Sequence, residues 1–333
     1  MTRSAGARPG ERDLDLLVVG ELNPDVIVSD PDPVPSFGER ERIVERIRLT
    51  VGSSSAIAAC GAARLGLRVA FAGVVGDDAF GRFMLAELAA RGIDVSACTV
   101  DPATPTGATV VLTSGRDRAI LTAIGTIGSL DPAAVPSPLV ARARHVHIGG
   151  FFLQGHARDT LPAFLSAARA RGATTSFDTN WDPAERWEGV GPMLEAADVF
   201  FPNAEEARQI SGRSDPEEAA RELARIGADG RTDGGPLVVV KLGADGALAC
   251  RASGPVERTP AMPIAVVDTT GAGDSFNAGF LRAWLSGESG GGSVSMALRS
   301  GAAAGALSTC RRGGVDGQPT TDQLDRALAG WAP

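Results

Sequence analysis

The chain has 333 residues, enough to bury the core of one large α/β domain or of two modest ones. Hydrophobic residues make up 44% of it and charged residues 22%, as in an ordinary soluble globular protein. The formal charge is −8 and the sequence has no local Lys/Arg cluster, so no electrostatic attraction to nucleic acid or anionic lipid is expected. No apolar run approaches the ~18 residues needed to span a bilayer. We therefore expect neither nucleic acid nor a membrane as a partner.

The cysteines and the N-terminal segment indicate a cytoplasmic protein. The four cysteines lie far apart and include no CxxC pair, which favours a reducing compartment. Cys60 and Cys310 stand among small residues and are expected to be core fillers. Residues 1–12 are polar and lack an apolar stretch, so we expect a disordered leader and not a secretory signal.

The first part of the chain predicts one buried strand and a small separate sheet. Residues 14–19 form an apolar run that ends in Gly20. Residues 40–50 alternate charged and aliphatic side chains, and residues 108–124 show a similar pattern around a turn at 114–116. We expect these two half-exposed patches to form a sheet outside the main body.

From residue 145 onward, short apolar runs alternate with alanine-rich helical segments. The expected strands are 146–148, 174–177, 199–201 and 237–241, and the helices between them include 158–171 and 205–210. Such alternation predicts βαβ units and a parallel sheet covered on both faces. Near the C-terminus, Phe276, Phe280 and Trp284 recur every four residues as one buried helix stripe, and residues 296–308 form a second helix able to pack closely.

The segment 266–276 carries the clearest chemical signal. A β-leaning run ends there, a Gly-x-Gly turn follows, and an amphipathic helix begins. The glycines let the backbone approach a ligand, and the amides of 271–273, backed by the helix dipole, make an anion hole suited to a phosphoryl group. Asp274, in the first turn, could accept a proton from an attacking hydroxyl. Spacing alone leaves a second interpretation equally open, in which Asp274 simply caps the helix.

The string DTTGAGDSFNAGFL at 268–281 resembles the C-terminal signature of the ribokinase (PfkB-type) carbohydrate kinases. Other segments match that family in order along residues 13–320. They are GELNPD at 20–25, the glycine signature at 52–66, AGVVGDDAFG at 72–81, NAEE at 203–206 and KLGADG at 241–246. The resemblance implies a ribokinase-like α/β fold over residues 13–325, with a Rossmann-like central parallel sheet flanked by helices. It also implies a small β-sheet lid formed by about 26–50 and 105–127.

The resemblance also implies site residues. The family's base maps onto Asp274 and its anion hole onto Gly271, Ala272 and Gly273. The substrate side would be formed by Asn23, Asp25, Gly52, Ser53, Ser54 and Ile57. ATP would lie against Asn203, Lys241, Gly243, Gly246, Thr269, Gly271 and Gly273. Magnesium would be placed through water by Asn203 and Glu206, and potassium would bind the loop that opens at Asp268.

Two departures from the family pattern bear on the substrate. The glycine signature usually opens Gly-Gly and carries an Asn five residues after its first Gly, but Gly52 is followed by Ser53 and the Asn position is Ile57. The family's Asp-Pro-Asn-x-Arg segment appears as residues 178–182, with Asp182 in place of the Arg. Both changes weaken an assignment to ribokinase or fructokinase proper.

Structural interpretations compete at several positions. His145 and His147 could be a metal pair, but a structural role is favoured. Asp25 could merely end a strand, although its spacing from Asn23 favours a hydroxyl-binding pair. Residues 205–206 could be a solvated helix start, and the resemblance favours function for Glu206 only. Lys241 is more often a strand-end charge than a phosphate ligand.

The function expected is transfer of the γ-phosphoryl of ATP to a primary alcohol of a sugar or sugar derivative. The alternatives are a nucleoside kinase of the same family and a non-catalytic sugar or nucleotide sensor on the same fold. A Rossmann dehydrogenase is disfavoured because no GxGxxG follows the first strand. The exact sugar, a requirement for potassium and a homodimer formed through the lid stay open.

Overall fold

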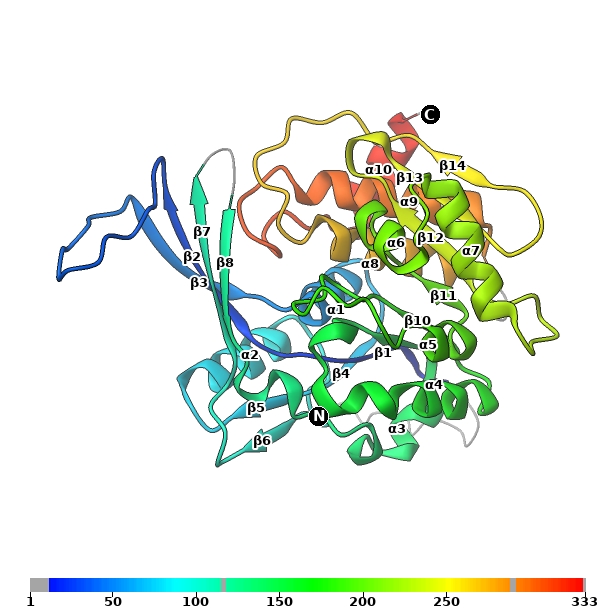
Figure 1. The fold of residues 1–333 in the computed structure, drawn as a ribbon, viewed down its shortest axis with the longest axis horizontal. Helices are drawn as coiled ribbons and strands as arrows, with labels where there is room; N and C mark the ends of the chain where they lie inside the picture. The colour runs from blue at the N-terminus through cyan, green and yellow to red at the C-terminus, as the bar shows by residue number, and fades with distance from the viewer. Residues whose placement is uncertain (1–11, 115–117, 288–291, 332–333) are drawn as a thin grey trace, which may run out of the picture.

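The computed structural model describes residues 12–114, 118–287 and 292–331, so most of the expected leader lies outside the described residues. Eight strands form the main sheet, in the order β14-β13-β12-β11-β10-β9-β1-β4 (Figure 1). Their bounds are Glu257–Thr259, Ala247–Cys250, Leu237–Lys241, Val199–Phe200, Thr174–Phe177, Ala143–Ile148, Leu14–Val19 and Val69–Ala72. The strands from β12 to β4 run parallel, as expected, whereas β13 and β14 are antiparallel. The sheet is therefore mixed at this edge.

Helices cover both faces of the main sheet, which explains why all six residues of β1 are buried. One face packs against α3 to α7, with bounds Ser137–Arg142, Leu161–Ala170, Gly191–Ala196, Ala204–Ser211 and Pro216–Ala228. The other packs against α1, α2, α8, α9 and α10, with bounds Ser54–Arg64, Ala79–Ala90, Ala272–Trp284, Val294–Ser308 and Thr321–Gly330. Among the described helices, none has the length and apolarity to cross a membrane.

Helices α8 and α9 pack closely because aromatic side chains on one meet small residues on the other. Phe276, Phe280 and Trp284 stack along α8 with ring centroids 6.4 and 5.9 Å apart, which confirms the predicted stripe. A Cβ added to Gly301 of α9 would come within 3.0 Å of the Phe276 ring. Cys310 is exposed, so the prediction of a core filler is wrong there, because α9 ends at Ser308 and the chain turns outward; Cys60 is buried as expected.

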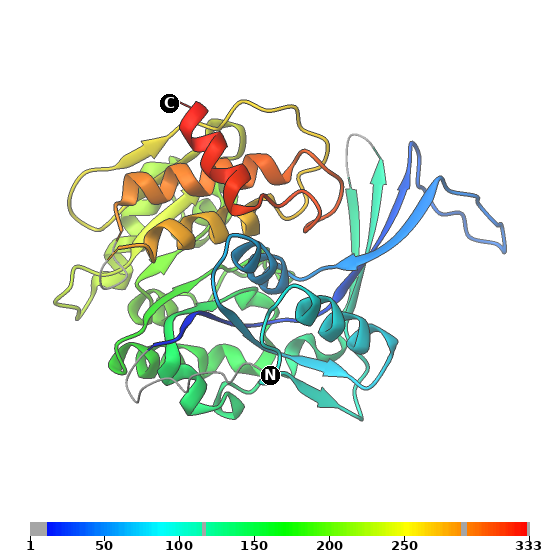
Figure 2. The same cartoon turned by 180° about the vertical axis from the view of Figure 1, so that it is seen from behind.

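A separate four-stranded sheet, here called the side sheet, projects from the body (Figure 2). Its order is β3-β2-β7-β8, with bounds Arg46–Val51, Pro24–Asp30, Ala108–Ser114 and Arg118–Ala123. Only residues 20–23 separate the end of β1 from the start of β2, the first strand of the side sheet in chain order. The register pairs Asp25 with Thr50, Ile27 with Arg48 and Ser29 with Arg46. Directly paired residues share a face, so Asp25, Arg48 and Arg46 lie on one face of the side sheet.

A two-stranded sheet, β5 (Val74–Gly76) and β6 (Thr99–Asp101), completes the described strands. The architecture confirms the expected ribokinase-like α/β fold with a separate small sheet.

Candidate active site

The N-terminus of α8 is open and is reached through a glycine turn. Gly271 is its N-cap residue, with φ of 70°, and no side chain caps the helix. A Cβ on Gly271 would lie 2.8 Å from the Gly314 backbone and 3.0 Å from Ile57, so both conformation and space require glycine. The first amides of a helix have no helical partners and face the positive end of its dipole. The capping interpretation of Asp274 is wrong, because this residue is the third of the helix.

Asp274 is half-buried beside this open helix end, and its pKa lies well above the ordinary value. Burial is the largest cause, and the Asp178 carboxylate adds to it, while Lys241 opposes it. A carboxylate with a raised pKa is a stronger proton acceptor than an exposed aspartate once it is ionised.

Lys241, Asp178 and Asn277 form a polar network behind the turn. Lys241 Nζ donates to Asp178 Oδ2 at 2.6 Å, and Asn277 Nδ2 donates to the same oxygen at 2.7 Å. Burial opposes both charges, but each ion favours the other, so the pKa of Asp178 is lowered and that of Lys241 is raised. A Cβ on Gly273 would lie 3.5 Å from Lys241 Nζ. The ammonium therefore lies directly behind the turn.

Asn277 and Asp178 are not among the site residues predicted from the sequence. The available signals were the position of Asn277 three residues after Asp274, on the same side of the helix, and the place of Asp178 at the end of β10. The Asn277 Oδ1 is buried and has no hydrogen-bond partner among the described residues.

Asn203 and Glu206 bond to one another at the start of α6. Asn203 N donates to Glu206 Oε2 and Glu206 N donates to Asn203 Oδ1, each at 2.8 Å, which is a capping box. Burial, followed by the Asp178 charge, raises the pKa of Glu206 to about 7. Glu205 points away and pairs with Arg208, so the structure places only Glu206 toward the Asp178–Lys241 network.

Asn23 and Asp25 lie where β1 passes into the side sheet, and both are buried. Burial raises the pKa of Asp25 to about 7, while Arg118 on β8 lowers it. A Cβ on Gly52 would lie 2.1 Å from Asp25 Oδ1, so Gly52 is required for this carboxylate to fit. Asn23 Nδ2 donates to Thr109 Oγ1 at 3.3 Å, whereas no described residue donates to the Asp25 carboxylate.

Glu21 organises the neighbouring helix start, a role that the sequence pattern did not predict. Its buried carboxylate accepts from Ser54 Oγ at 2.8 Å, from Ser55 Oγ at 2.5 Å and from Gln154 Nε2 at 3.1 Å. Ser54 Oγ also accepts from Asn180 Nδ2 at 2.8 Å. Ser53, with φ of 67°, caps α1 and donates to the Glu21 carbonyl, so its hydroxyl is occupied by the fold.

Ile57 packs behind the glycine turn. It is 4% exposed, and a Cβ on Gly314 would lie 2.6 Å from its Cδ1. Asp268 stabilises the other side of the turn by accepting from Thr270 Oγ1 at 2.7 Å and from Gly313 N at 2.9 Å. Burial opposes ionisation of Asp268, but these donors lower its pKa.

The two glycines assigned to the nucleotide side differ in their surroundings. Gly243 has φ of 61° and open space where a Cβ would stand. A Cβ on Gly246 would lie 2.0 Å from the Thr259 carbonyl, so Gly246 is required by packing. Thr269 accepts a hydrogen bond from Ala272 N at 3.2 Å through its carbonyl and thereby closes the turn.

The His145–His147 pair and Asp182 have structural roles. His145 and His147 are buried and share Ser176 Oγ at 2.7 and 2.8 Å, and burial lowers the pKa of both. No group of three or more metal-ligating side chains occurs within residues 12–114, 118–287 and 292–331. Asp182 accepts from the backbone of residues 184, 186 and 187, so it shapes the turn after β10.

The geometry defines a class of protein. An open helix N-terminus backed by an ammonium, with a carboxylate of raised pKa beside it and together with the buried pair Asn23 and Asp25, suits the chemistry of a phosphotransferase. The pfkB family carbohydrate kinase model matches residues 13–321, and the chain belongs to that family. It is a carbohydrate kinase, a phosphotransferase with a sugar alcohol as acceptor.

Relatives and solved structures agree with this assignment. The chain is 31% identical to 2-dehydro-3-deoxygluconokinase of Thermoproteus tenax, over 98% of this chain and 97% of the relative. A provisionally named ribokinase II from E. coli, solved with ATP and Mg²⁺, is 26% identical with a TM-score of 0.78, covering 95% of this chain and 99% of that one. A double-mutant fructokinase from Vibrio cholerae O395, solved with fructose, ADP and potassium ion, is 25% identical with a TM-score of 0.78, covering 96% and 99%. None of these supports a nucleoside kinase or a sensor.

Proposed function

We propose that Asp274 is the general base for in-line transfer of the γ-phosphoryl of ATP to a primary alcohol of a sugar or sugar derivative. The raised pKa of Asp274 beside the uncapped start of α8 is the observation that carries this proposal. The carboxylate takes the hydroxyl proton as the new P–O bond forms. The amides of Gly271 and Gly273 stabilise the charge on the transferring group, while that of Ala272 donates to the Thr269 carbonyl and holds the turn in shape. Catalysis is mainly positioning and electrostatics.

Asn23 and Asp25 orient the acceptor, assisted by Ser54 and the backbone at Gly52 and Ser53. The support is that the Asp25 carboxylate is buried yet receives no hydrogen bond from the described residues, which leaves it free for a substrate hydroxyl. A buried acceptor without a donor costs free energy, and a sugar hydroxyl would recover it. Ile57 acts from behind, by packing against the turn that carries the anion hole.

ATP binds on the side of Asn203, Lys241, Gly243, Gly246 and Thr269. Asn203 and Glu206 would place magnesium through water molecules, and the ion would supply positive charge that neutralises the phosphoryl oxygens. The raised pKa of Glu206 supports this role, because a nearby cation would return it to the ionised form. Potassium would bind the loop that opens at Asp268.

The side sheet acts as a lid formed by about residues 26–50 and 105–127, within a kinase domain of residues 13–325. Its contact with the body supports this role, since Arg118 Nη1 donates to Thr270 Oγ1 at 3.4 Å beside the glycine turn. Ile47 and Leu121, on the face opposite Asp25, are 64% and 63% exposed, which favours pairing of two lids in a homodimer. The four cysteines are all free, which fits a cytoplasmic location.

A substrate panel tests the proposed function. ADP release is measured by a coupled assay with sugars, sugar acids and nucleosides, at saturating ATP and magnesium. Turnover of at least one sugar or sugar acid above the nucleosides is expected. Nucleosides as the best acceptors would contradict the proposed substrate class, and release of ADP without a phosphorylated product would contradict transfer to an alcohol.

A further inference from the structure

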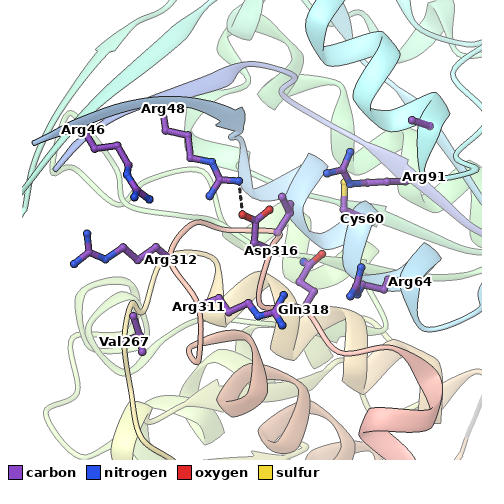
Figure 3. A pocket seen from close by; sticks show the side chains of 12 residues that line it. Arg46, Arg48, Cys60, Arg64, Arg91, Val267, Arg311, Arg312, Asp316 and Gln318 are labelled. Atoms are coloured by element: carbon purple, nitrogen blue, oxygen red, sulfur yellow. Dashed lines mark hydrogen bonds and ion pairs between the residues drawn. The ribbon is translucent and has the colours of Figure 1, made fainter.

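Six arginines surround a pocket of about 860 Å³ between the side sheet and the body (Figure 3). Arg46 and Arg48 come from β3, Arg64 ends α1, Arg91 follows α2, and the loop after α9 supplies Arg311 and Arg312. These arginines come from four separate segments, so they form no Lys/Arg cluster in the sequence. Asn23, Asp25, Lys241 and Asp274 do not line the pocket, so it is distinct from the candidate active site.

The pocket has an excess of positive charge in a chain whose formal charge is −8. Arg48 pairs with Asp316, and Arg91 pairs with Glu87 at 2.6 Å. Within the part of the chain that the structure describes, no carboxylate lies within 4.0 Å of the other four guanidinium groups, which belong to Arg46, Arg64, Arg311 and Arg312. Like charges gathered in one concavity repel one another, and a bound anion would remove that cost.

The chemistry of the pocket selects its ligand. Guanidinium groups bind phosphate and carboxylate through paired N–H donors. Figure 3 shows Arg46 and Arg48 on one side of the pocket and Arg311 and Arg312 on the other, so one ligand with separated anionic groups could engage both sides. The volume lies in the range of about 300–1,000 Å³ that is usual for small-molecule sites.

We propose that this pocket binds a small molecule with two or more phosphate or carboxylate groups, and that the bound anion holds the side sheet against the body. Arg46 and Arg48 lie on the face of the side sheet that carries Asp25. On the body, Arg311 and Arg312 directly precede Gly313, whose N–H donates to Asp268 at 2.9 Å, and Gly314 packs against Gly271. The ligand therefore joins the acceptor side of the active site to the loop of the anion hole.

Binding is tested by calorimetry with inorganic tripolyphosphate in the absence of magnesium, first without nucleotide and then with ADP present to fill the nucleotide site. One equivalent is expected to bind the wild type. The double variant Arg46→Ala/Arg312→Ala should bind about tenfold or more weakly, since charge-assisted hydrogen bonds are lost. Arg225→Ala on α7, far from the pocket, is the matched control and should bind as the wild type does. Absent binding, binding abolished by ADP, or equal binding by the double variant would overturn the proposal.

Stability measurements separate a binding role from a structural one. Removing unpaired like charges should leave the urea midpoint of Arg312→Gln unchanged or raise it at low salt, with a smaller effect at high salt. A lower midpoint would mean that Arg312 serves the fold. Sedimentation of the double variant is the companion measurement, because loss of a dimer without tripolyphosphate binding would assign the pocket to a second copy of the chain and overturn the small-molecule site.

The coupling to the lid rests on the proposed function and is measured separately. Tripolyphosphate should tighten sugar binding in the wild type and not in the double variant, and sugar should tighten tripolyphosphate binding by the same factor. Equal sugar affinity with and without tripolyphosphate would overturn the coupling. Because the first calorimetric test requires no turnover, its outcome does not depend on the catalytic roles proposed above.

Discussion

Lys241 Nζ lies 2.6 Å from Asp178 Oδ2, behind the glycine turn that begins α8. The side chain of Asp178 is 3% exposed and that of Lys241 is 14% exposed, so water screens the attraction between the two charges only weakly. Burial is the largest cause of the raised pKa of both Asp274 and Glu206; the Asp178 charge raises both pKa values further, and Lys241 lowers them. One ion pair thus acts on both the proposed base and the proposed metal-placing carboxylate.

Replacement of the base should abolish turnover without abolishing binding. Asn keeps the size of Asp274 but cannot accept the hydroxyl proton, so Asp274→Asn should lower kcat by ~10²–10⁴-fold. Calorimetry should give ATP and sugar dissociation constants close to those of the wild type. A variant whose kcat stays within about threefold of the wild type would eliminate Asp274 as the base.

Glu206→Gln should raise the magnesium concentration needed for the half-maximal rate by about tenfold. The variant should fold normally because Gln at the third helical position keeps the capping box with Asn203. Glu205→Gln, one position away on the exposed side, is the control and should titrate as the wild type does. An unchanged magnesium titration for Glu206→Gln would remove this residue from the metal site.

Potassium should accelerate the reaction relative to tetramethylammonium at equal ionic strength. Asp268 accepts hydrogen bonds from Thr270 N and from Gly313 N, each at 2.9 Å, and so joins the loop before α8 to the loop after α9. Loops of backbone carbonyls and carboxylates suit hard monovalent cations. Asp268→Asn should lose the difference between the two cations. Equal wild-type rates in both salts would count against the cation site and leave the kinase mechanism intact.

Ile57→Asn tests whether the departure at position 57 concerns specificity or packing. The side chain lies against Gly271 and Gly314, so a polar replacement should lower the free energy of unfolding by about 2–4 kcal/mol and reduce kcat for all acceptors. Ile57→Val, which keeps an apolar contact, should cost only about 1 kcal/mol. A changed ranking of acceptors for Ile57→Asn would instead assign the position to specificity.

The raised pKa of Asp25 predicts a pH-dependent effect on stability. Between its unfolded value of 3.8 and its folded value of about 7, the folded chain binds the proton more tightly, so stability from this group is lost as pH rises through that window. Asp25→Asn should therefore gain about 2–3 kcal/mol relative to the wild type between pH 5 and pH 8. Urea unfolding at both pH values gives the difference.

Asp77→Asn, at a side chain that is 67% exposed, is the control for this pH test and should show no such change. An Asp25→Asn variant that tracks the wild type at both pH values would mean that the Asp25 carboxylate is not buried in solution. Sugar binding by Asp25→Asn should be weakened at pH 8, which separates its role in binding from its cost to the fold.

Several elements follow directly from local sequence patterns. The strands at 14–19, 174–177 and 237–241 have the predicted bounds because short apolar runs between turn residues leave few other conformations. The stripe of Phe276, Phe280 and Trp284 was predictable for the same reason. The strand predicted over residues 40–50 begins only at Arg46. An alternation of charged and aliphatic side chains does not by itself show where a strand begins.

The sequence by itself determined the α/β fold, the glycine turn at 271–273 and the place of Asp274 beside it, because these depend on residues adjacent in the chain. Only the tertiary structure decided that Asp178, Lys241 and Asn277 meet, that Glu21 holds two serines and Gln154, and that six arginines share one pocket. The physical reason is that pKa values and charge balance depend on burial and on neighbours in space. Segments distant in sequence become such neighbours only when the sheet assembles and brings the ends of its strands to one edge.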